Sequence, residues 1–164
     1  MKNRMFAILA LLLVTAFAVS GVITKSQAQG TAATPAATSV GNTLYNLNTG
    51  TSDQYLTIPN MNGRMVREFM EYRPYESILV FRKEIGKYVD ASQVAEWEKY
   101  VFVPIQIDQA DVATLKQIPG VTDQIANDLI SARPYNTNDA FLTKLATYLS
   151  ADQVSYAKNL LEAK

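Results

Sequence analysis

The sequence predicts an all-α protein of two tandem units, each of about four short helices, after an N-terminal signal and a flexible linker. Three observations carry this prediction. The chain repeats itself at an offset of sixty residues, helix-capping residues recur at matching places in both copies, and the apolar residues between the caps follow helical spacing. An internal repeat of this kind indicates that one folding unit has been duplicated.

Residues 47–104 align without a gap with residues 107–164, and the two units are predicted to be 47–104 and 105–164. Ile58-Pro59 in the first copy returns as Ile118-Pro119 in the second. Each copy is small but long enough to fold by itself. The other identical pairs are Arg73/Arg133, Pro74/Pro134, Tyr75/Tyr135, Phe81/Phe141, Tyr88/Tyr148, Ala91/Ala151, Gln93/Gln153 and Val94/Val154.

Composition argues against catalysis. Residues 30–164 carry 12 basic and 15 acidic side chains, a net charge of about −3, so there is no broad basic field for a polyanion. The chain has no Cys and no His, which excludes disulfides, thiol nucleophiles and the commonest metal ligands. Neither a phosphate-cradling glycine loop nor a serine-nucleophile motif occurs. We expect no enzyme, no cofactor and no metal.

Residues 1–28 have the pattern of a secretory signal. Basic residues at the start precede an apolar run from Phe6 to Val19, and Ser26-Gln27-Ala28 provides the small residues that a signal peptidase reads. The alternative is an uncleaved anchor, because Met5 to Ile23 is long enough to span a bilayer. We expect an exported protein, periplasmic, lumenal or extracellular, that touches a membrane only if this segment is uncleaved.

Residues 29–46 are predicted to be a flexible linker. From Gly30 to Asn46 the residues are small, uncharged and of low complexity, and they offer too little apolar surface to fold.

Caps and apolar spacing define the expected helices. Thr51 with Gln54, and Asp90 with Gln93, have the spacing of capping boxes, and Pro74 ends the second helix because the residue before a proline avoids the helical region. The first copy is expected to form one helix through Tyr55 and Ile58, one over Arg64 to Tyr72, one from Ser77 through Phe81, Ile85 and Tyr88, and one through Val94, Trp97 and Val101. Matching caps in the second copy are Asp111, Thr137 and Ser150 with Gln153.

Two short helices joined by a Pro-Gly-apolar-Gly type of hairpin resemble the helix-hairpin-helix domain family, which has a SAM-like fold. The resemblance covers nearly all of 47–164 and is clearest from Leu115 to Tyr135. Two secreted branches are similar: the bacterial competence DNA-receptor type, and the branch of the small extrinsic lumenal subunit of photosystem II, where the fold is structural. Asn48-Thr49 and Pro74-Tyr75-Glu76-Ser77 resemble the second branch.

In the members that bind DNA, the resemblance implies that hairpin N–H groups and the next helix N-terminus receive a phosphate. The first copy keeps only the late glycine of that hairpin, although asparagine also tolerates the left-handed turn. The candidate contact residues for phosphate, DNA or a partner are Asn60, Met61, Asn62, Gly63, Arg64 and Arg67.

The second hairpin is a poorer phosphate site. Gly120 is kept and Val121 is apolar, but Thr122 stands where a glycine is usual, and Asp123 places a carboxylate at the helix start, where it repels phosphate. The later hairpins, 89–92 and 149–152, have lost their glycines and also present an acid.

Several residues have a structural interpretation beside the functional one. Arg64 and Arg67 would pair with Glu68 and Glu71 on a solvated helix face, and Trp97, which matches Ala157, would lie at the join of the units or on a partner-facing patch. Scattered acids at helical spacing are expected to form a solvated face. Arg73 and Arg133 would support a helix C-terminus, and Tyr75 and Tyr135 would pack under the third helix of each copy rather than stack on bases.

These observations favour an exported scaffold or binding protein that docks on another protein or an envelope assembly through a helical face. The alternative is sequence-independent DNA binding at the cell surface, as in the competence-receptor type, through the backbone phosphates.

Overall fold

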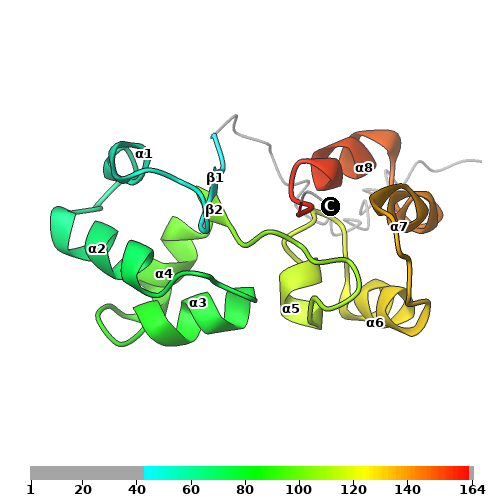
Figure 1. Ribbon diagram of the computed structural model, residues 1–164, viewed down its shortest axis with the longest axis horizontal. Coiled ribbons are helices and arrows are strands. Elements are labelled where there is room, and N and C mark those ends of the chain that lie inside the picture. Colours follow the sequence, from blue (N-terminus) through cyan, green and yellow to red (C-terminus); the bar gives the residue numbers. More distant parts are fainter. Residues whose placement is uncertain (1–42, 163–164) are drawn as a thin grey trace, which may run out of the picture. The chain divides into compact units, whose positions relative to one another are not determined.

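The computed structural model describes residues 43–162 (Figure 1). The predicted signal, 1–28, and the linker up to residue 42 lie outside this range. Within it, no helix is long and apolar enough to cross a membrane.

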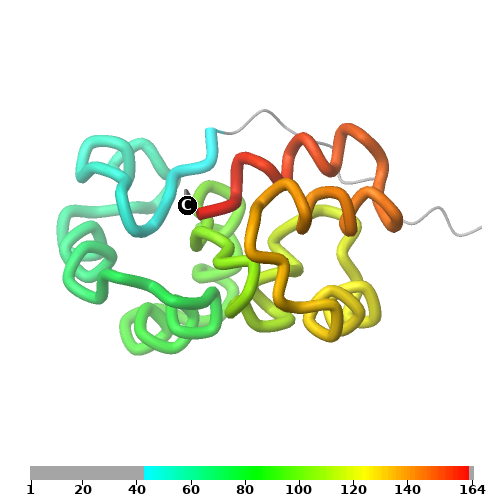
Figure 2. The backbone as a smooth tube through the Cα atoms, turned by 45° about the vertical axis from the view of Figure 1, so that its right-hand side comes forward, coloured from blue at the N-terminus to red at the C-terminus, as the bar shows by residue number. Residues whose placement is uncertain are grey.

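The described chain is mostly helical, which confirms the all-α class. Figure 2 traces it along the sequence, from cyan near residue 43 through green and yellow to red near residue 162. The elements are β1 (Tyr45–Asn46), α1 (Ser52–Leu56), α2 (Gly63–Glu71), α3 (Ile78–Ile85), α4 (Ala91–Trp97), β2 (Val101–Phe102), α5 (Val112–Leu115), α6 (Asp123–Ser131), α7 (Asn138–Leu145) and α8 (Ala151–Lys158).

Helices α5 to α8 repeat α1 to α4 at the sixty-residue offset. Each helix begins at a side chain that accepts a hydrogen bond from a backbone N–H of its first turn, which satisfies a donor that the helix cannot pair internally. All six predicted caps are found, and the hairpin residues Asn62 and Thr122 are caps as well. The N-caps in chain order are Thr51, Asn62, Ser77, Asp90, Asp111, Thr122, Thr137 and Ser150.

Three predicted helices end two or more residues earlier than expected. Helix α1 stops at Leu56, before Ile58. Helix α3 stops at Ile85, so Tyr88 lies in the following turn, and α4 stops at Trp97. Val101 belongs to β2, where it pairs with Tyr45 of β1 in parallel. The pairing takes the backbone of this segment out of helical geometry.

The linker boundary at residue 46 was wrong, because Tyr45 and Asn46 are held in β1. The N–H of Tyr45 donates to the Tyr100 carbonyl over 2.8 Å, and that of Leu47 donates to Phe102 over 2.9 Å. The Tyr45 ring meets Tyr55 edge to face with 6.5 Å between centroids, so this position has an aromatic contact that the rest of the linker sequence does not offer. An isolated parallel bridge, Ile105 to Leu161, repeats the pairing in the second copy.

Each copy has its own hydrophobic core. The first is aromatic: Phe69 meets Tyr55, Phe81 and Trp97 edge to face, with centroids 5.2–5.6 Å apart. Such pairs add about 0.5–1.5 kcal/mol beyond area burial. In the second core the matching positions hold smaller residues, Leu129 and Ala157, both fully buried.

Trp97 is a core residue, so both positions expected for it, the join of the units and a partner-facing patch, were wrong. It is 2% exposed, and its indole N–H donates to the Pro59 carbonyl over 3.0 Å. The match to Ala157 was misleading because the two cores are filled by side chains of different size.

An arginine ties the loop before the first helix of each copy to the end of the second helix. The Arg73 guanidinium donates to the carbonyls of Leu47 (2.5 Å) and Gly50 (2.7 Å) and to the Tyr55 hydroxyl (2.5 Å). Arg133 donates to the matching carbonyls of Ile107 (2.9 Å) and Ala110 (2.5 Å). The role is structural, but the acceptors are loop carbonyls rather than those of a helix C-terminus.

The two copies meet where α3 lies beside α5 (Figure 1). The N–H of Ile78, at the start of α3, donates to the Thr114 hydroxyl over 3.0 Å, and Thr114 is fully buried. The Gln117 side-chain amide bonds both the N–H (2.9 Å) and the carbonyl (3.0 Å) of Val103. The joint is therefore held by polar groups satisfied within the protein.

We expect Arg73→Met to lower the free energy of unfolding by about 2–4 kcal/mol, because two carbonyls and a buried tyrosine hydroxyl lose a charged donor. Arg82→Met is the control. Arg82 forms a solvent-exposed ion pair with Glu98, and its loss should cost less than about 1 kcal/mol. Urea denaturation measures both, and equal losses would contradict the structural role of Arg73.

The two matching tyrosines differ in how their hydroxyls are satisfied. Burial raises the pKa of Tyr75 and of Tyr55 above the ordinary value. The Tyr135 hydroxyl donates to the Leu129 carbonyl over 2.8 Å, whereas that of Tyr75 is buried without a partner among the described residues. A buried tyrosinate is thus disfavoured in the folded state.

Because these pKa values are raised by folding, the free energy of unfolding should be level below about pH 10 and fall above it, where the unfolded chain loses its protons first. Tyr75→Phe removes one of these groups and an unsatisfied hydroxyl. It should leave stability within about 1 kcal/mol of wild type at pH 7 and weaken the decline above pH 10. Denaturation at a series of pH values tests this, and an unchanged alkaline slope would contradict it.

Candidate functional site

The first hairpin is closed over its own backbone donors. Asn60 has a positive φ of 60°, which asparagine tolerates. The side chain of Asn62 accepts from the N–H groups of Arg64 and Met65, each over 3.1 Å. Gly63 opens α2, and a Cβ added to it would meet nothing within 4 Å. These two N–H groups therefore donate to Asn62 and are not available to donate to a phosphate.

The two arginines beside this hairpin are exposed and form no ion pair within residues 43–162. The expected pairing with Glu68 and Glu71 is not found there. The Arg64 guanidinium lies 5.6 Å from the centre of the Tyr88 ring. Hydrogen bonds to Tyr72 and Glu68 raise the pKa of Tyr88.

The second hairpin carries a negative charge at its helix start. Val121 is 6% exposed and belongs to the core. The Thr122 hydroxyl caps α6 by accepting a hydrogen bond from the Ile125 N–H. The Asp123 carboxylate pairs with Lys116 over 2.8 Å. The Thr122 hydroxyl is thus already bonded, and the Asp123 carboxylate would repel an anion at this helix start.

The later hairpins also present acids. Hydrogen bonds from the Ser92 hydroxyl and the Gln93 backbone N–H lower the pKa of Asp90. Asp152 lies in the first turn of α8.

Only one of the two predicted boxes at these later hairpins forms completely. Gln153 bonds back to the Ser150 N–H over 2.9 Å, but Gln93 does not reach Asp90, and its amide nitrogen is buried without a partner among the described residues. In the second copy the Gln153 amide rests on Gly120, where an added Cβ would collide with it. Asn60, at the matching place in the first copy, carries that Cβ, which explains why Gln93 is displaced.

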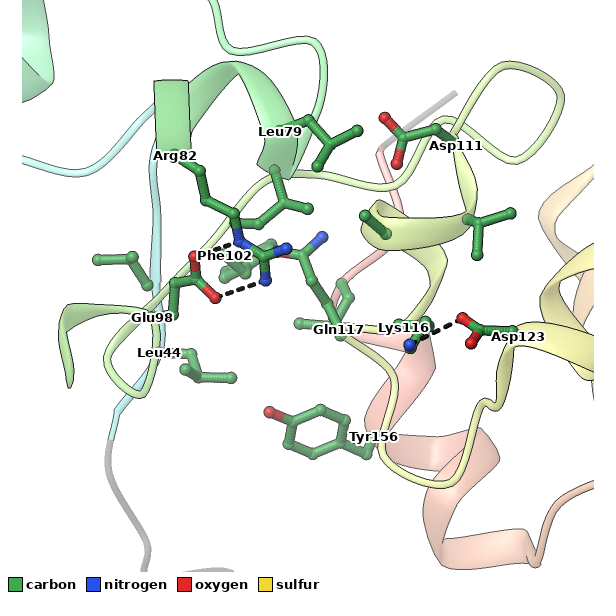
Figure 3. A pocket seen from close by; sticks show the side chains of 15 residues that line it. Leu44, Leu79, Arg82, Glu98, Phe102, Asp111, Lys116, Gln117, Asp123 and Tyr156 are labelled. Atoms are coloured by element: carbon green, nitrogen blue, oxygen red, sulfur yellow. Dashed lines mark hydrogen bonds and ion pairs between the residues drawn. The ribbon is translucent and has the colours of Figure 1, made fainter. Parts of the chain in front are cut away.

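A groove between the copies is the larger candidate site; we call it the inter-repeat groove. Its volume is about 590 Å³. Figure 3 shows Leu79 of α3 beside the groove, with Tyr156 and Leu44 on the side away from α3. It is lined by Leu44, Ile78, Leu79, Arg82, Glu98, Val101, Phe102, Asp111, Val112, Ala113, Lys116, Gln117, Asp123, Tyr156 and Leu160.

Four of the five charged side chains that line this groove form two ion pairs, and the fifth, Asp111, accepts a hydrogen bond from the Thr114 N–H over 2.7 Å. An apolar side chain beside them is left exposed. Arg82 and Glu98 form a two-pronged pair over 2.7 and 2.8 Å (Figure 3), which raises the pKa of Arg82. Leu79 is 49% exposed. The sequence analysis missed this site, although one signal was present: Leu79 matches Asp139, so only the first copy exposes an apolar residue there.

A second groove begins where the first ends; we call it the uncharged groove. Its volume is about 570 Å³, and it shares Leu44, Phe102, Tyr156 and Leu160 with the inter-repeat groove. Its other lining residues are Thr43, Tyr45, Asn46, Thr49, Gly50, Thr51, Gln54 and Asn159.

Residues 43–162 contain no group of three or more acidic side chains placed to hold a metal ion. The chain matched no protein-family model, no curated protein and no solved structure in the comparisons made. The candidate sites of this chain are the two grooves and the hairpins.

We expect Gly120→Ala to destabilise the protein by about 1–2 kcal/mol or more. Gly120 has a φ of 90°, which costs an L-residue about 1–2 kcal/mol, and the new methyl group would displace the Gln153 amide. Asn60→Gly is the reverse change and should raise stability by up to about 1 kcal/mol, because it frees Gln93 to complete its box. Thermal or urea unfolding measures both, and shifts of the same sign would contradict the explanation.

Proposed function

We propose that this protein is an exported, non-enzymatic scaffold of two tandem helix-hairpin-helix units, which docks on another protein or an envelope assembly through the inter-repeat groove. The half-exposed Leu79 carries this proposal, because it lies in a groove where four charges form ion pairs and the fifth, Asp111, caps α5. The hairpin sequences and the matching caps support the family, and the residues before 29 support export.

The chemistry of the groove defines the partner segment. Both ion pairs are satisfied internally, and the Asp111 carboxylate already accepts from the Thr114 N–H. A charged segment would therefore have to compete with one of these interactions or lose its water without compensation. The lining also includes Val112 and Ala113 of α5, the helix that α3 contacts. The fitting partner is therefore a protein segment that inserts apolar side chains and carries no charge at its centre.

Burial of an exposed leucine contributes about 1.5–3 kcal/mol, which is a tenfold or greater change in affinity. The joint between copies, with its buried Thr114, gives this surface a fixed geometry, and a pre-organised surface loses little entropy on binding.

DNA binding is the second candidate, and the unpaired Arg64 and Arg67 are the observation that favours it. The self-capped hairpin, Asp123 and the acidic balance weigh against it. Phosphate contacts would make the affinity fall steeply with salt.

To test docking, a photo-reactive residue is placed at position 79 or 56 of the full-length protein in its native cells. Leu56 is the matched control, because it is 51% exposed but lies on α1, outside both grooves. We expect a discrete protein adduct from position 79 and none from 56. Recovery of that partner should fall about tenfold or more in Leu79→Asp and stay unchanged in Leu56→Asp.

Equal recovery with both variants would contradict docking in the groove. Salt-sensitive binding to a random DNA duplex, lost in Arg64→Ala/Arg67→Ala, would replace docking by the second candidate.

A further inference from the structure

The uncharged groove has no acidic or basic side chain among its lining residues. Charged residues make up 18% of the chain, so about two would be expected among the twelve lining residues. An ionic ligand placed there would lose water and find no opposite charge. The occupant of this groove is expected to be neutral.

The two copies differ at the wall that α8 contributes. Tyr156 and Asn159 line the groove, and the matching residues of the first copy, Glu96 and Lys99, form an exposed ion pair at 2.7 Å. The second copy thus has an aromatic ring and an amide where the first has two charges. The fold itself does not require neutral residues at these positions.

Part of the groove is fixed and part is left available for hydrogen bonding. Thr51 and Gln54 are held in a reciprocal capping box, and the Tyr45 hydroxyl bonds Thr57 over 3.0 Å. In contrast, the side chains of Thr49, Tyr156 and Asn159 have no hydrogen-bond partner among the described residues. They offer two hydroxyls and one amide, each able to donate and to accept.

Aromatic surface lies next to these polar groups. Tyr156 is partly buried, and burial raises the pKa of its hydroxyl. Phe102 is also partly buried and lines the same groove. Figure 3 shows the Tyr156 ring on the same side as Leu44. An occupant would thus meet ring faces and hydroxyl or amide groups together.

We propose that the uncharged groove binds a neutral saccharide. A pyranose ring has a face of C–H groups that packs on aromatic side chains and a rim of hydroxyls that pair with amides and hydroxyls. This combination matches Tyr156, Asn159 and Thr49. The groove volume of about 570 Å³ lies within the ~300–1,000 Å³ typical of ligand sites. The site adjoins the inter-repeat groove and shares Tyr156 with it, but Leu79, Thr49 and Asn159 each line only one of the two grooves.

The test titrates the full-length protein with maltotriose, cellotriose and tri-N-acetylchitotriose, followed by NMR and calorimetry. We expect saturable binding of at least one sugar at up to about 10 mM, with shifts at Thr49, Tyr156 and Asn159 and none at Leu79. Because no charge is involved, the affinity should not change between about 0.05 and 0.5 M salt.

Tyr156→Ala should weaken binding about tenfold, and Asn159→Ala should weaken it as well. Asn159 is an exposed residue, so its substitution tests the site without disturbing the core. Tyr148→Ala is the control, since Tyr148 is a partly buried tyrosine of the same copy that lies outside the groove. It should leave binding unchanged.

Absence of saturable binding by all three sugars would overturn the proposal. Binding that persists in both Tyr156→Ala and Asn159→Ala would do the same. A neutral Thr/Ala/Pro peptide that binds the groove in place of the sugars would assign it to a protein segment instead.

Discussion

The guanidinium of an arginine, repeated sixty residues apart, holds each copy closed. Arg73 and Arg133 follow the second helix of their copies and bond carbonyls that precede the first helix. Within residues 43–162 these carbonyls accept no hydrogen bond from a backbone N–H. A long side chain with a rigid fork of donors is therefore well suited to the position. With the loop fixed, the first helix and the edge of the core also have fixed positions. The grooves are built on this frame.

Duplication preserved the frame and allowed the surfaces to diverge. The caps, the arginines and the Tyr75/Tyr135 pair stay in register. In contrast, Leu79 is aligned with Asp139, and Tyr156 is aligned with Glu96. Leu79 and Tyr156 both line a groove. Function in this chain is therefore expected at positions where the copies differ, because the shared residues are already occupied in holding the fold.

Local rules predicted the helices well, since a cap and its first turn are only a few residues apart. Thr51, Ser77, Asp111 and Thr137 all begin helices as expected. Contacts between distant segments were beyond such rules: the β1–β2 pairing joins residues more than fifty positions apart, and Trp97 is buried because Phe69 and Pro59 surround it. The inter-repeat groove arises only when α3 packs beside α5, so no single stretch of sequence contained it. The candidate hairpin residues could be located, but their donors proved to be bonded to Asn62 and Thr122.

The parallel pairing of β1 with β2 has a mechanical consequence. The chain enters the first copy through β1 and leaves it through β2 toward the second copy, with both strands running in one direction. A pull between the N-terminus and the second copy therefore draws the strands past each other along their length. The hydrogen bonds from Tyr45 to Tyr100 and from Leu47 to Phe102 share that load together, in shear, instead of opening one after another. Under such a pull, the place where the chain enters the fold at β1 would resist stretching through both hydrogen bonds at once.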